Sequence, residues 1–476
     1  MTGTRSLARI VLVLHILVWT APVPAASARP TLLEPDGTLL IEGERSFPIG
    51  IYEFPQEDAV LREIAEAGFN LIRCSASTEH LDRAASAGLK AWISLGNSMD
   101  VRDNASRDKL AGIIAGYKDH PALVVWEAPD EPLWNVWYST FNWFHGEQPR
   151  LFREHIESAK KAGKTVSPMQ AVLRHYQTGL ETADYAGAES AASKLWQLLE
   201  MKSPKPDLPM TTAPRRAREL ADGLFEGYEL VRQMDLAHPL WINHAPRNTI
   251  PDLAYFNRAG DIVGCDIYPV PEVPQNGHSD LANRRINCVG DYTDRMRAAA
   301  PGKPAWMVLQ GFGWGDLSVD WPEPAKTGRR PTYAETRFMA YDAIVHGAKG
   351  ILYWGTHYVE KPSPFWTDLK RVVRELHEMQ HVLAAPFETL NIGVTLEPTL
   401  HSTDRGIAVM AKRVDGRLVL IVVNELHEPV SFSISGLPLP DGTRLRDDTG
   451  TRTVTVKGRR IPYSLRRYGI AVLMGE

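Results

Sequence analysis

The chain has 476 residues and a mass of 53.1 kDa, with 44% apolar and 23% charged residues. It is too long for one ordinary domain, and this composition excludes intrinsic disorder as the main state. There are 53 basic and 57 acidic residues, and no Lys/Arg run exceeds a pair, so neither a nucleic acid nor an anionic membrane is indicated as partner. The three cysteines cannot form a disulfide framework.

Residues 1–28 have the pattern of a secretory signal peptide. Arg5 and Arg9 precede an apolar stretch at residues 10–19, and Ala26-Ser27-Ala28 offers a cleavage position with small residues. The stretch is shorter than the roughly 20 residues that span a bilayer, which makes a retained anchor the weaker interpretation. We therefore expect a secreted or periplasmic protein without a membrane span.

Short apolar runs alternate with helical patterns eight times between residues 47 and 382. Most runs are apolar throughout, which is typical of strands buried on both faces. Helices between such strands require parallel pairing, and eight such units close into a (β/α)8 TIM barrel, expected over residues 29–386. The expected strands are residues 47–52, 69–75, 89–95, 122–128, 239–243, 262–268, 305–309 and 350–354.

The intervening helices are predicted from apolar spacing and from stop signals. The third begins at Ser106, as its expected cap. An open doubly wound sheet is the main alternative, but it would normally carry a glycine-rich phosphate loop after its first strand. This chain has Glu53-Phe54-Pro55-Gln56 there. The other expected helices are residues 58–67, 78–87, 214–234, 251–258, 290–300, 332–346 and 363–382.

A segment at about residues 133–213 is too long for a simple loop between strand and helix. It is rich in aromatic residues near its start and contains helical patterns. Two interpretations remain open: a lid that lines the site at the barrel mouth, or a local core of its own. The aromatic residues are Trp134, Trp137, Tyr138, Phe141, Trp143 and Phe144.

From Gly393 the pattern changes to a period of two, within an expected domain of residues 387–476. Expected strands at 407–412, 418–424, 430–434, 453–456 and 470–474, with a hairpin turn at Asp415-Gly416, predict a small antiparallel β-sandwich. A packing domain is favoured over an accessory sugar-binding module.

Polar and aromatic residues follow the predicted barrel strands, at the end where barrel active sites form. Aromatic rings stack on the apolar faces of sugars, while acids and amides bind their hydroxyl groups. The spacing of these residues matches no metal motif, and no cofactor is indicated. The expected substrate-binding residues are Glu53, Arg73, Asn243, His244, Asp266, Tyr268, Gln310 and Trp354, with Trp137 from the insertion.

One sequence that can bind zinc lies elsewhere. His377-Glu378-Met379-Gln380-His381 matches HExxH, which places two imidazoles on one face of a helix. It falls on the closing helix of the barrel, away from the mouth. Two surface or packing histidines are therefore the favoured interpretation.

The segment from Trp126 to Pro132 carries the strongest chemical signal. Glu131 follows the fourth strand, and the carboxyl of Asp130 beside it would raise its pKa by like-charge repulsion. A carboxyl that stays protonated near neutral pH can act as the general acid that a glycosidic oxygen needs before it leaves. The alternative is that Asp130 merely caps the next helix, with Pro132 in its first turn.

Several segments match motifs of one enzyme clan. They are Gly68-Phe69-Asn70-Leu71-Ile72-Arg73, Lys118-Asp119-His120-Pro121-Ala122-Leu123, Asp266-Ile267-Tyr268-Pro269 and Gly347-Ala348-Lys349-Gly350, together with the Asp-Glu-Pro sequence at 130–132. With these motifs the chain resembles, over about residues 47–386, the (β/α)8-barrel clan of glycoside hydrolases. The resemblance implies that Glu131 is the catalytic acid/base.

The chain departs from that clan at the nucleophile. The clan has a glutamate at the end of strand seven, whereas this chain has Gln310, and an amide cannot form the glycosyl-enzyme ester. Asp130 also stands where the clan usually has asparagine. The adjacent acids resemble those of hexosaminidases that use substrate assistance, in which the aspartate orients the 2-acetamido group of the sugar. Other nucleophile candidates are Glu127, Glu53 and Asp266, with Glu127 expected to lie too deep.

The sequence thus favours a secreted glycoside hydrolase that cleaves O-glycosidic bonds of a poly- or oligosaccharide. The replacement at Gln310 keeps a second hypothesis open, a catalytically inactive barrel that binds carbohydrate. A third is a barrel enzyme of another class, such as a lyase or a metal-dependent hydrolase.

Overall fold

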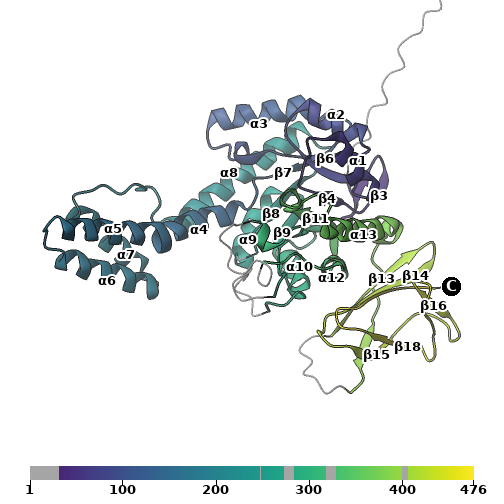
Figure 1. Cartoon of the computed structure of the whole chain (residues 1–476). Helices are drawn as coiled ribbons and strands as arrows, with labels where there is room; N and C mark the ends of the chain where they lie inside the picture. Colours follow the sequence, from purple (N-terminus) through teal and green to yellow (C-terminus); the bar gives the residue numbers. More distant parts are fainter. Residues whose placement is uncertain (1–31, 247, 273–282, 318–327, 399–405, 476) are drawn as a thin grey trace, which may run out of the picture.

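The computed structural model describes residues 32–246, 248–272, 283–317, 328–398 and 406–475 (Figure 1). The predicted signal peptide lies outside these residues. Of the helices within them, none is both long and apolar enough to cross a bilayer. The described chain forms a barrel ringed by helices, a helical arm, and a pair of antiparallel sheets near the carboxyl terminus (Figure 1).

Eight parallel strands form a closed barrel, as the alternating pattern predicted. They pair in chain order, and the last strand closes on the first with Ile351 opposite Ile49. Nearly every residue in them is buried, which explains why the runs are continuously apolar. The strands are β4 (Ile49–Ile51), β5 (Leu71–Cys74), β6 (Lys90–Ser94), β7 (Leu123–Glu127), β8 (Leu240–His244), β9 (Ile262–Ile267), β10 (Ala305–Gln310) and β11 (Ala348–Trp354).

The helices around the barrel begin at clear capping residues. Ser77, Thr249, Thr332 and Ser363 each accept a hydrogen bond from a backbone N–H of the first helical turn. The third helix is capped by Asp103 rather than by Ser106, whose backbone N–H donates to Asp103 Oδ1 at 2.8 Å. The helices are α1 (Asp58–Glu66), α2 (Thr78–Ser86), α3 (Asn104–Tyr117), α8 (Ala213–Met234), α9 (Ile250–Phe256), α10 (Cys288–Ala299), α12 (Tyr333–Val345), α13 (Pro364–Glu378) and α14 (Gln380–Leu383).

A small antiparallel sheet, which the sequence analysis did not predict, covers the amino ends of the barrel strands. It consists of β1 (Leu32–Leu33), β2 (Leu39–Ile41) and β3 (Glu44–Ser46). Lys349, near the start of β11, donates to Asp36 and Thr38 of this segment. The sheet leaves the carboxyl end of the barrel as the end available for a site.

Three tryptophans fill the barrel interior. Trp92, Trp241 and Trp306 are fully buried in one cluster with Leu39. Gly264 makes this packing possible, because a Cβ there would lie 2.4 Å from Nε1 of Trp241. The barrel is therefore a packed core rather than a channel.

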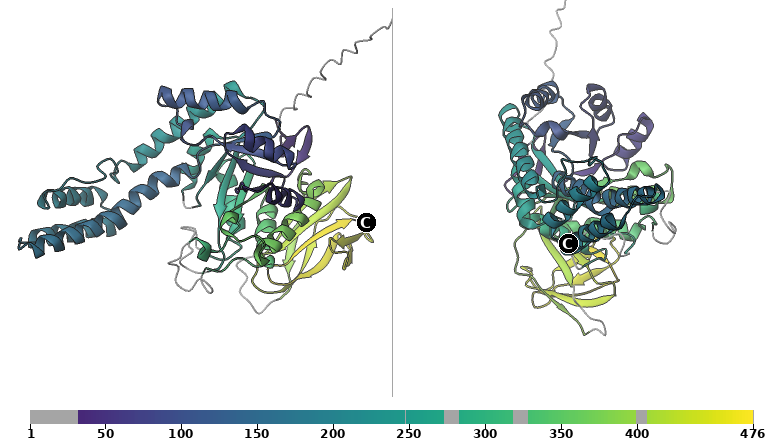
Figure 2. Two further views of the ribbon diagram at one scale, coloured as in Figure 1. Left: turned by 45° about the horizontal axis from the view of Figure 1, so that its top comes forward. Right: turned by 90° about the vertical axis from the view of Figure 1, so that its left-hand side faces the viewer.

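The insertion forms a helical arm that projects from the barrel (Figures 1 and 2). Trp143 and Trp196 are buried with Phe152, Tyr176 and Leu195 in a core separate from that of the barrel. Trp143 and Phe144 belong to this core, so the local-core interpretation describes these two residues. The arm comprises α4 (Pro132–Asn142), the π-helix η2 (Trp143–Glu147), α5 (Gln148–Lys161), α6 (Ser167–Glu181) and α7 (Tyr185–Leu198).

Two antiparallel sheets form the predicted β-sandwich. One orders β12 (Gly393–Leu396), β15 (Val430–Ser435) and β18 (Arg460–Leu465), and the other β13 (Ile407–Val414), β14 (Arg417–Asn424), β19 (Ile470–Gly475), β16 (Arg444–Asp447) and β17 (Thr453–Thr455). The strands β12, β16 and β18 were not predicted. Charged residues interrupt the apolar pattern of β16, and Arg460 and Pro462 interrupt that of β18, whereas β12 has only four residues.

Strand β14 joins the sandwich to the barrel. Val419, Ile421 and Val423 belong to the core of the barrel, whereas Leu420 and Val422 belong to the core of the sandwich. This alternation follows from the period of two along a strand. The five-stranded sheet thus buries both of its faces, as a packing domain does.

Candidate active site

Glu131 occupies an unusual backbone position between β7 and α4. Its φ of 47° and ψ of 47° are left-handed, a conformation that costs a non-glycine residue about 1 kcal/mol or more. Glu131 is also the N-cap of α4, with Pro132 as the first helical residue, but its side chain makes no capping hydrogen bond. Such strain is concentrated at functional sites, and here the carboxyl is turned toward β9 instead of the helix.

The side chain of Asp130 does not cap the helix. Its Oδ1 accepts a hydrogen bond from Nδ2 of Asn243, at the end of β8, at 2.9 Å. Its backbone oxygen accepts a hydrogen bond from the side chain of Asn135 at 3.0 Å. Burial raises the pKa of Asp130, although the Asn243 hydrogen bond and Arg73 oppose the rise. The capping alternative is therefore wrong for the Asp130 side chain.

The carboxyls of Glu131 and Asp266 are hydrogen-bonded to each other, which requires a shared proton. Asp266 lies in β9 and is 7% exposed. Burial, followed by the charge of Asp130, raises the pKa of Glu131 to about 7. Burial and the charges of Glu131 and Asp130 raise the pKa of Asp266 well above its usual range. The pair therefore holds a proton at neutral pH.

Arg73 and Glu127 form an ion pair beneath these acids. Nε of Arg73 lies 3.0 Å from Oε2 of the fully buried Glu127, and the guanidinium lies 5.4 Å from the ring centroid of Tyr52. Burial raises the pKa of Glu127 to about 7 despite this partner. Arg73 also opposes the charge of Asp130, so one guanidinium offsets several neighbouring carboxyls.

Besides Oε1 of Glu127, three polar atoms beside these acids are buried without a hydrogen-bond partner among the described residues. They are the hydroxyl of Tyr52, Oδ1 of Asn243 and Oδ1 of Asp266. After burial, the charges of Glu127 and Asp130 contribute most to the raised pKa of Tyr52, so its hydroxyl lies beside these acids. Burial of an unpaired polar atom costs about 1–3 kcal/mol, so three such atoms together indicate a polar ligand.

Aromatic rings line one side of this group. Tyr268, after β9, stacks on Trp354 at a centroid distance of 5.6 Å. Phe312 meets both rings edge-on at 5.1 Å, and Trp314 and Tyr358 extend the same group. The sequence analysis did not select Phe312 or Trp314, although Gly311-Phe312-Gly313-Trp314 directly after a barrel strand is a usable signal.

Gln310 braces two loops rather than facing the acids. Its Nε2 donates to the backbone oxygens of Val270 and Phe312 at 2.7 and 3.1 Å, and its Oε1 accepts from the N–H of Val270 at 2.9 Å. The side chain is fully buried and its amide is fully used. The structure therefore does not bring this predicted substrate-binding residue to the acids.

His244 also lies away from the acids. Neighbours in a strand face opposite sides, so Asn243 and His244 cannot both point to the mouth. His244 is fully buried, its Nε2 lies 2.9 Å from Oδ1 of Asn257, and its ring packs edge-on against Phe256. Burial lowers its pKa to about 4. Its environment is a structural one.

The remaining predicted residues occupy the margins. Both oxygens of Glu53 accept from Nζ of Lys361 at 2.8 Å, so its charge is already paired. Trp137 packs at the root of the arm against the barrel core, beside Pro214 of α8 and Tyr255 of α9.

The HExxH segment is not on one continuous helix. Helix α13 ends at Glu378 and α14 begins at Gln380, while His377 packs beside Gly68. Its two histidines thus lack the continuous helical face that the zinc motif requires.

The fold is similar to that of solved glycoside hydrolases. The β-galactosidase from Bacillus circulans sp. alkalophilus matches with a TM-score of 0.52 at 10% identity, over 90% of this chain and 99% of that one. A protein described as a glycoside hydrolase matches with a TM-score of 0.52 at 11% identity, over 94% and 96%. Gan42B, a GH42 β-galactosidase from G. stearothermophilus, gives 0.52 at 10%, over 90% and 98%.

These likenesses confirm the predicted resemblance in fold. No protein-family model and no curated protein sequence matches the chain. At such low identities a shared fold does not assign the reaction, which has to be argued from the residues at the barrel mouth.

Proposed function

We propose that this protein is a glycoside hydrolase in which Glu131 is the general acid/base. The observation that carries the proposal is the position of Glu131, which is held in a left-handed backbone conformation and shares a proton with Asp266. With a pKa of about 7 the carboxyl is protonated often enough at neutral pH to donate to a leaving oxygen. General acid catalysis of this kind contributes about 10²–10⁴-fold.

A sugar ring suits the surroundings of Glu131. The unpaired atoms of Tyr52, Asn243 and Asp266 offer one donor and several acceptors for hydroxyl groups. The stacked rings of Tyr268 and Trp354 offer an apolar face beside them. Polar contacts at the edge and aromatic contacts on the face are the combination that carbohydrate recognition requires.

Substrate assistance accounts best for the carboxyls that are present. Asp266 is hydrogen-bonded to Glu131, whereas the two carboxyls of a retaining pair lie on either side of the sugar, ~5–5.5 Å apart. Glu127 is fully buried, and Glu53 is paired with Lys361. Asp130 remains, half-buried and held by Asn243. We therefore propose that the substrate carries a 2-acetamido group and that Asp130 orients this group for attack on the anomeric carbon.

A carbohydrate-binding protein without turnover is the second candidate. Gln310 favours this candidate. It ends β10 and has an amide at the position where the glycoside hydrolase clan that the chain resembles has its nucleophile. This candidate predicts glycan binding with no hydrolysis of any member of a substrate panel.

The test is a hydrolysis screen on aryl glycosides and polysaccharides, with Glu131→Gln as the matched control. The panel should include β-galactosides, because two of the structural neighbours are named β-galactosidases, and N-acetylhexosaminides. Turnover by the wild type that is lost in the variant supports the proposal. Glycan binding with no turnover across the panel replaces it with the second candidate.

A trapping experiment separates substrate assistance from an enzyme nucleophile. A 2-fluoro glycoside leaves a covalent ester on an enzyme carboxylate, and mass spectrometry locates the labelled residue. We expect no label, together with inhibition by a thiazoline mimic of the cyclised acetamido sugar. A label on Asp266 or Glu127 would remove substrate assistance while leaving the role of Glu131 intact.

Export is the remaining part of the proposal. The basic and apolar pattern of residues 1–28 supports cleavage and secretion. Amino-terminal sequencing of the protein recovered outside the cytoplasm tests it.

A further inference from the structure

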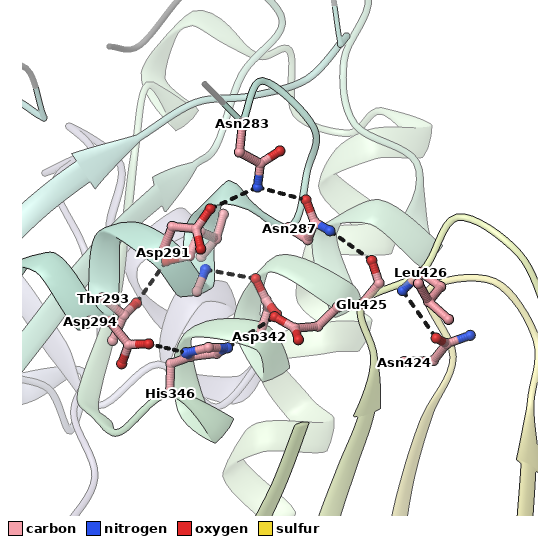
Figure 3. Close-up of polar contacts among 12 residues, drawn as sticks. Asn283, Asn287, Asp291, Thr293, Asp294, Asp342, His346, Asn424, Glu425 and Leu426 are labelled. Carbon is pink, nitrogen blue, oxygen red and sulfur yellow. Dashed lines mark hydrogen bonds and ion pairs between the residues drawn. The ribbon is translucent and has the colours of Figure 1, made fainter. Parts of the chain in front are cut away.

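A second buried acidic group lies where the barrel meets the β-sandwich (Figure 3). Asp342 and His346 belong to α12 and its end, and Glu425 directly follows β14 of the sandwich. Each residue offers one atom that could bind a metal ion, and these three atoms lie within 4.8 Å of one another. Asp342 is fully buried, and the side chains of Glu425 and His346 are 9% and 17% exposed.

Structural roles account for only part of Asp342. Its Oδ2 accepts a hydrogen bond of 2.7 Å from the backbone N–H of Gly290 in the first turn of α10, which satisfies a free donor at that helix end. Its Oδ1 has no hydrogen-bond partner within the part of the chain that the structure describes. A buried carboxylate oxygen without a partner is costly, so this atom indicates a missing ligand.

His346 has the orientation of a metal-binding imidazole. Its Nδ1 lies 2.8 Å from Oδ2 of Asp294, and its Nε2 lies 3.0 Å from Oε1 of Glu425 (Figure 3). A carboxylate on one ring nitrogen commonly fixes the tautomer and turns the other nitrogen toward a metal. Two atoms bonded to one tetrahedral Zn²⁺ at about 2.1 Å lie about 3.4 Å apart, so Nε2 and Oε1, now 3.0 Å apart, need to separate only slightly to bind one ion.

We propose that Asp342, His346 and Glu425 bind one divalent cation of the zinc type at the junction of the barrel and the sandwich. An imidazole with two carboxylates favours Zn²⁺ over Ca²⁺, which takes oxygen ligands alone. The cation would give Oδ1 of Asp342 its partner. Because Glu425 comes from the sandwich and the other two ligands from the barrel, it would also hold the two parts together. His346 and Glu425 are 79 positions apart in the sequence and Asp342 lies further still from Glu425, so no local sequence motif predicts the group.

Protons compete with a cation for the side chains of this group. Burial lowers the pKa of His346, but its hydrogen bonds to Asp294 and Glu425 outweigh this and raise the pKa to about 10. Burial and the charge of Glu425 raise the pKa of Asp342 well above its usual range. Asp291 adds a further negative charge, and Arg297 binds the backbone oxygen of His346. Because a cation needs deprotonated ligands, it would have to displace the protons held by this group.

The primary test is metal content. The untagged protein is loaded with Zn²⁺ at pH 8, passed through a desalting column and analysed by mass spectrometry of the elements. We expect about one zinc per chain in the wild type. We expect a loss of at least tenfold in affinity for Asp342→Asn and for Glu425→Gln. The glutamine oxygen can still accept from His346, so the second variant remains informative if the first does not fold.

Asp448→Asn is the matched control. Asp448 also lies at this junction, where an oxygen is 3.4 Å from Arg337, but it is not a ligand of the proposed site. This variant must retain zinc. Equal zinc contents in the wild type and the Asp342→Asn and Glu425→Gln variants, or no zinc in the wild type, would overturn the proposal.

Stability and activity give independent readouts. At a free Zn²⁺ concentration of about 100 times Kd the melting temperature should rise by roughly 3 °C relative to protein treated with a chelator, and Asp342→Asn should remove this difference. Hydrolysis well below the melting temperature should not respond to the chelator, because the acids of the barrel mouth are a separate group. A chelator that abolishes hydrolysis without changing the melting temperature would contradict the location proposed here.

Discussion

Within the described residues, two groups of carboxyls include buried members, and their surroundings differ. The mouth group is Glu127, Asp130, Glu131 and Asp266. Its member Glu127 is paired with Arg73, and the group lies beside aromatic rings and unpaired polar atoms. The junction group consists of the buried Asp342 and Glu425 and the exposed Asp294, which surround the imidazole of His346 between two domains. Both raise the pKa values of buried acids. Only the mouth group adds an aromatic surface for an organic ligand. A raised pKa alone therefore does not indicate a reaction, and the residues around the acid have to be considered with it.

Removing the guanidinium should have the largest effect on the mouth group. Arg73→Met leaves Glu127 buried without its partner, and we expect a loss of about 3–5 kcal/mol in the free energy of unfolding above pH 7. Below that pH Glu127 takes up a proton, so the penalty should shrink as the pH falls. Denaturation in urea at pH 5 and pH 8 measures both values. An equal loss at the two pH values would show that Glu127 carries no buried charge.

Replacing Gln310 by an acid should destabilise the protein near the mouth group without adding a nucleophile. In Gln310→Glu a carboxylate replaces the amide that donates to the oxygens of Val270 and Phe312, and we expect a loss of about 2–3 kcal/mol in stability. The new acid is fully buried, so hydrolysis should not increase. Gln310→Met, which is neutral, is the control for lost hydrogen bonds. A gain in turnover in Gln310→Glu would show that β10 can supply a nucleophile.

The pH dependence of hydrolysis should follow the proton on Glu131. Because burial and Asp130 raise its pKa to about 7, kcat/KM should be constant just below that pH. Above it we expect a fall of about tenfold, or 1.4 kcal/mol, for each pH unit. In Asp130→Asn the descending limb should move to lower pH, since a like charge that holds the proton on Glu131 is lost. An unmoved limb would assign it to another group.

Aromatic substitutions should have the smallest effect on the mouth group and sharpen its contrast with the arm. Trp354→Ala should weaken glycan binding by about 1–2 kcal/mol, since it removes the ring that stacks on Tyr268. Trp143→Ala should leave affinity unchanged but destabilise the arm, whose core contains this ring. Trp137→Ala should resemble Trp143→Ala, because Trp137 packs against the barrel core. Isothermal titration and thermal unfolding of all three variants measure these effects.

The barrel could be predicted because all eight strands are short apolar runs separated by helices with clear stop signals. The sheet formed by β1, β2 and β3 could not, since its strands have only two or three residues. At the site, the sequence located Glu131, Asp130 and Asp266 through the positions that follow parallel strands. It placed His244 wrongly because the alternation along β8, which sends Asn243 inward, was not applied.

The rest of the site could not be predicted because it depends on contacts between residues far apart in the sequence. The hydrogen bond between Glu131 and Asp266 joins residues far apart in the chain, and so does the approach of Glu425 to His346. Gln310 was expected to face the substrate because it ends a barrel strand, where site residues usually lie. The carbonyl groups that bind its side chain belong to loop geometry, which apolar patterns do not encode.

The most direct test of the central claim is how the effect of Glu131→Gln depends on the leaving group. A general acid matters most when the leaving oxygen is basic and least when it leaves unaided. We predict that kcat/KM falls by at least ~10²-fold on alkyl or sugar leaving groups and by far less on 2,4-dinitrophenyl glycosides of the same sugar. Equal losses on both classes of substrate, or turnover like that of the wild type on the first, would contradict the assignment of Glu131 as the general acid.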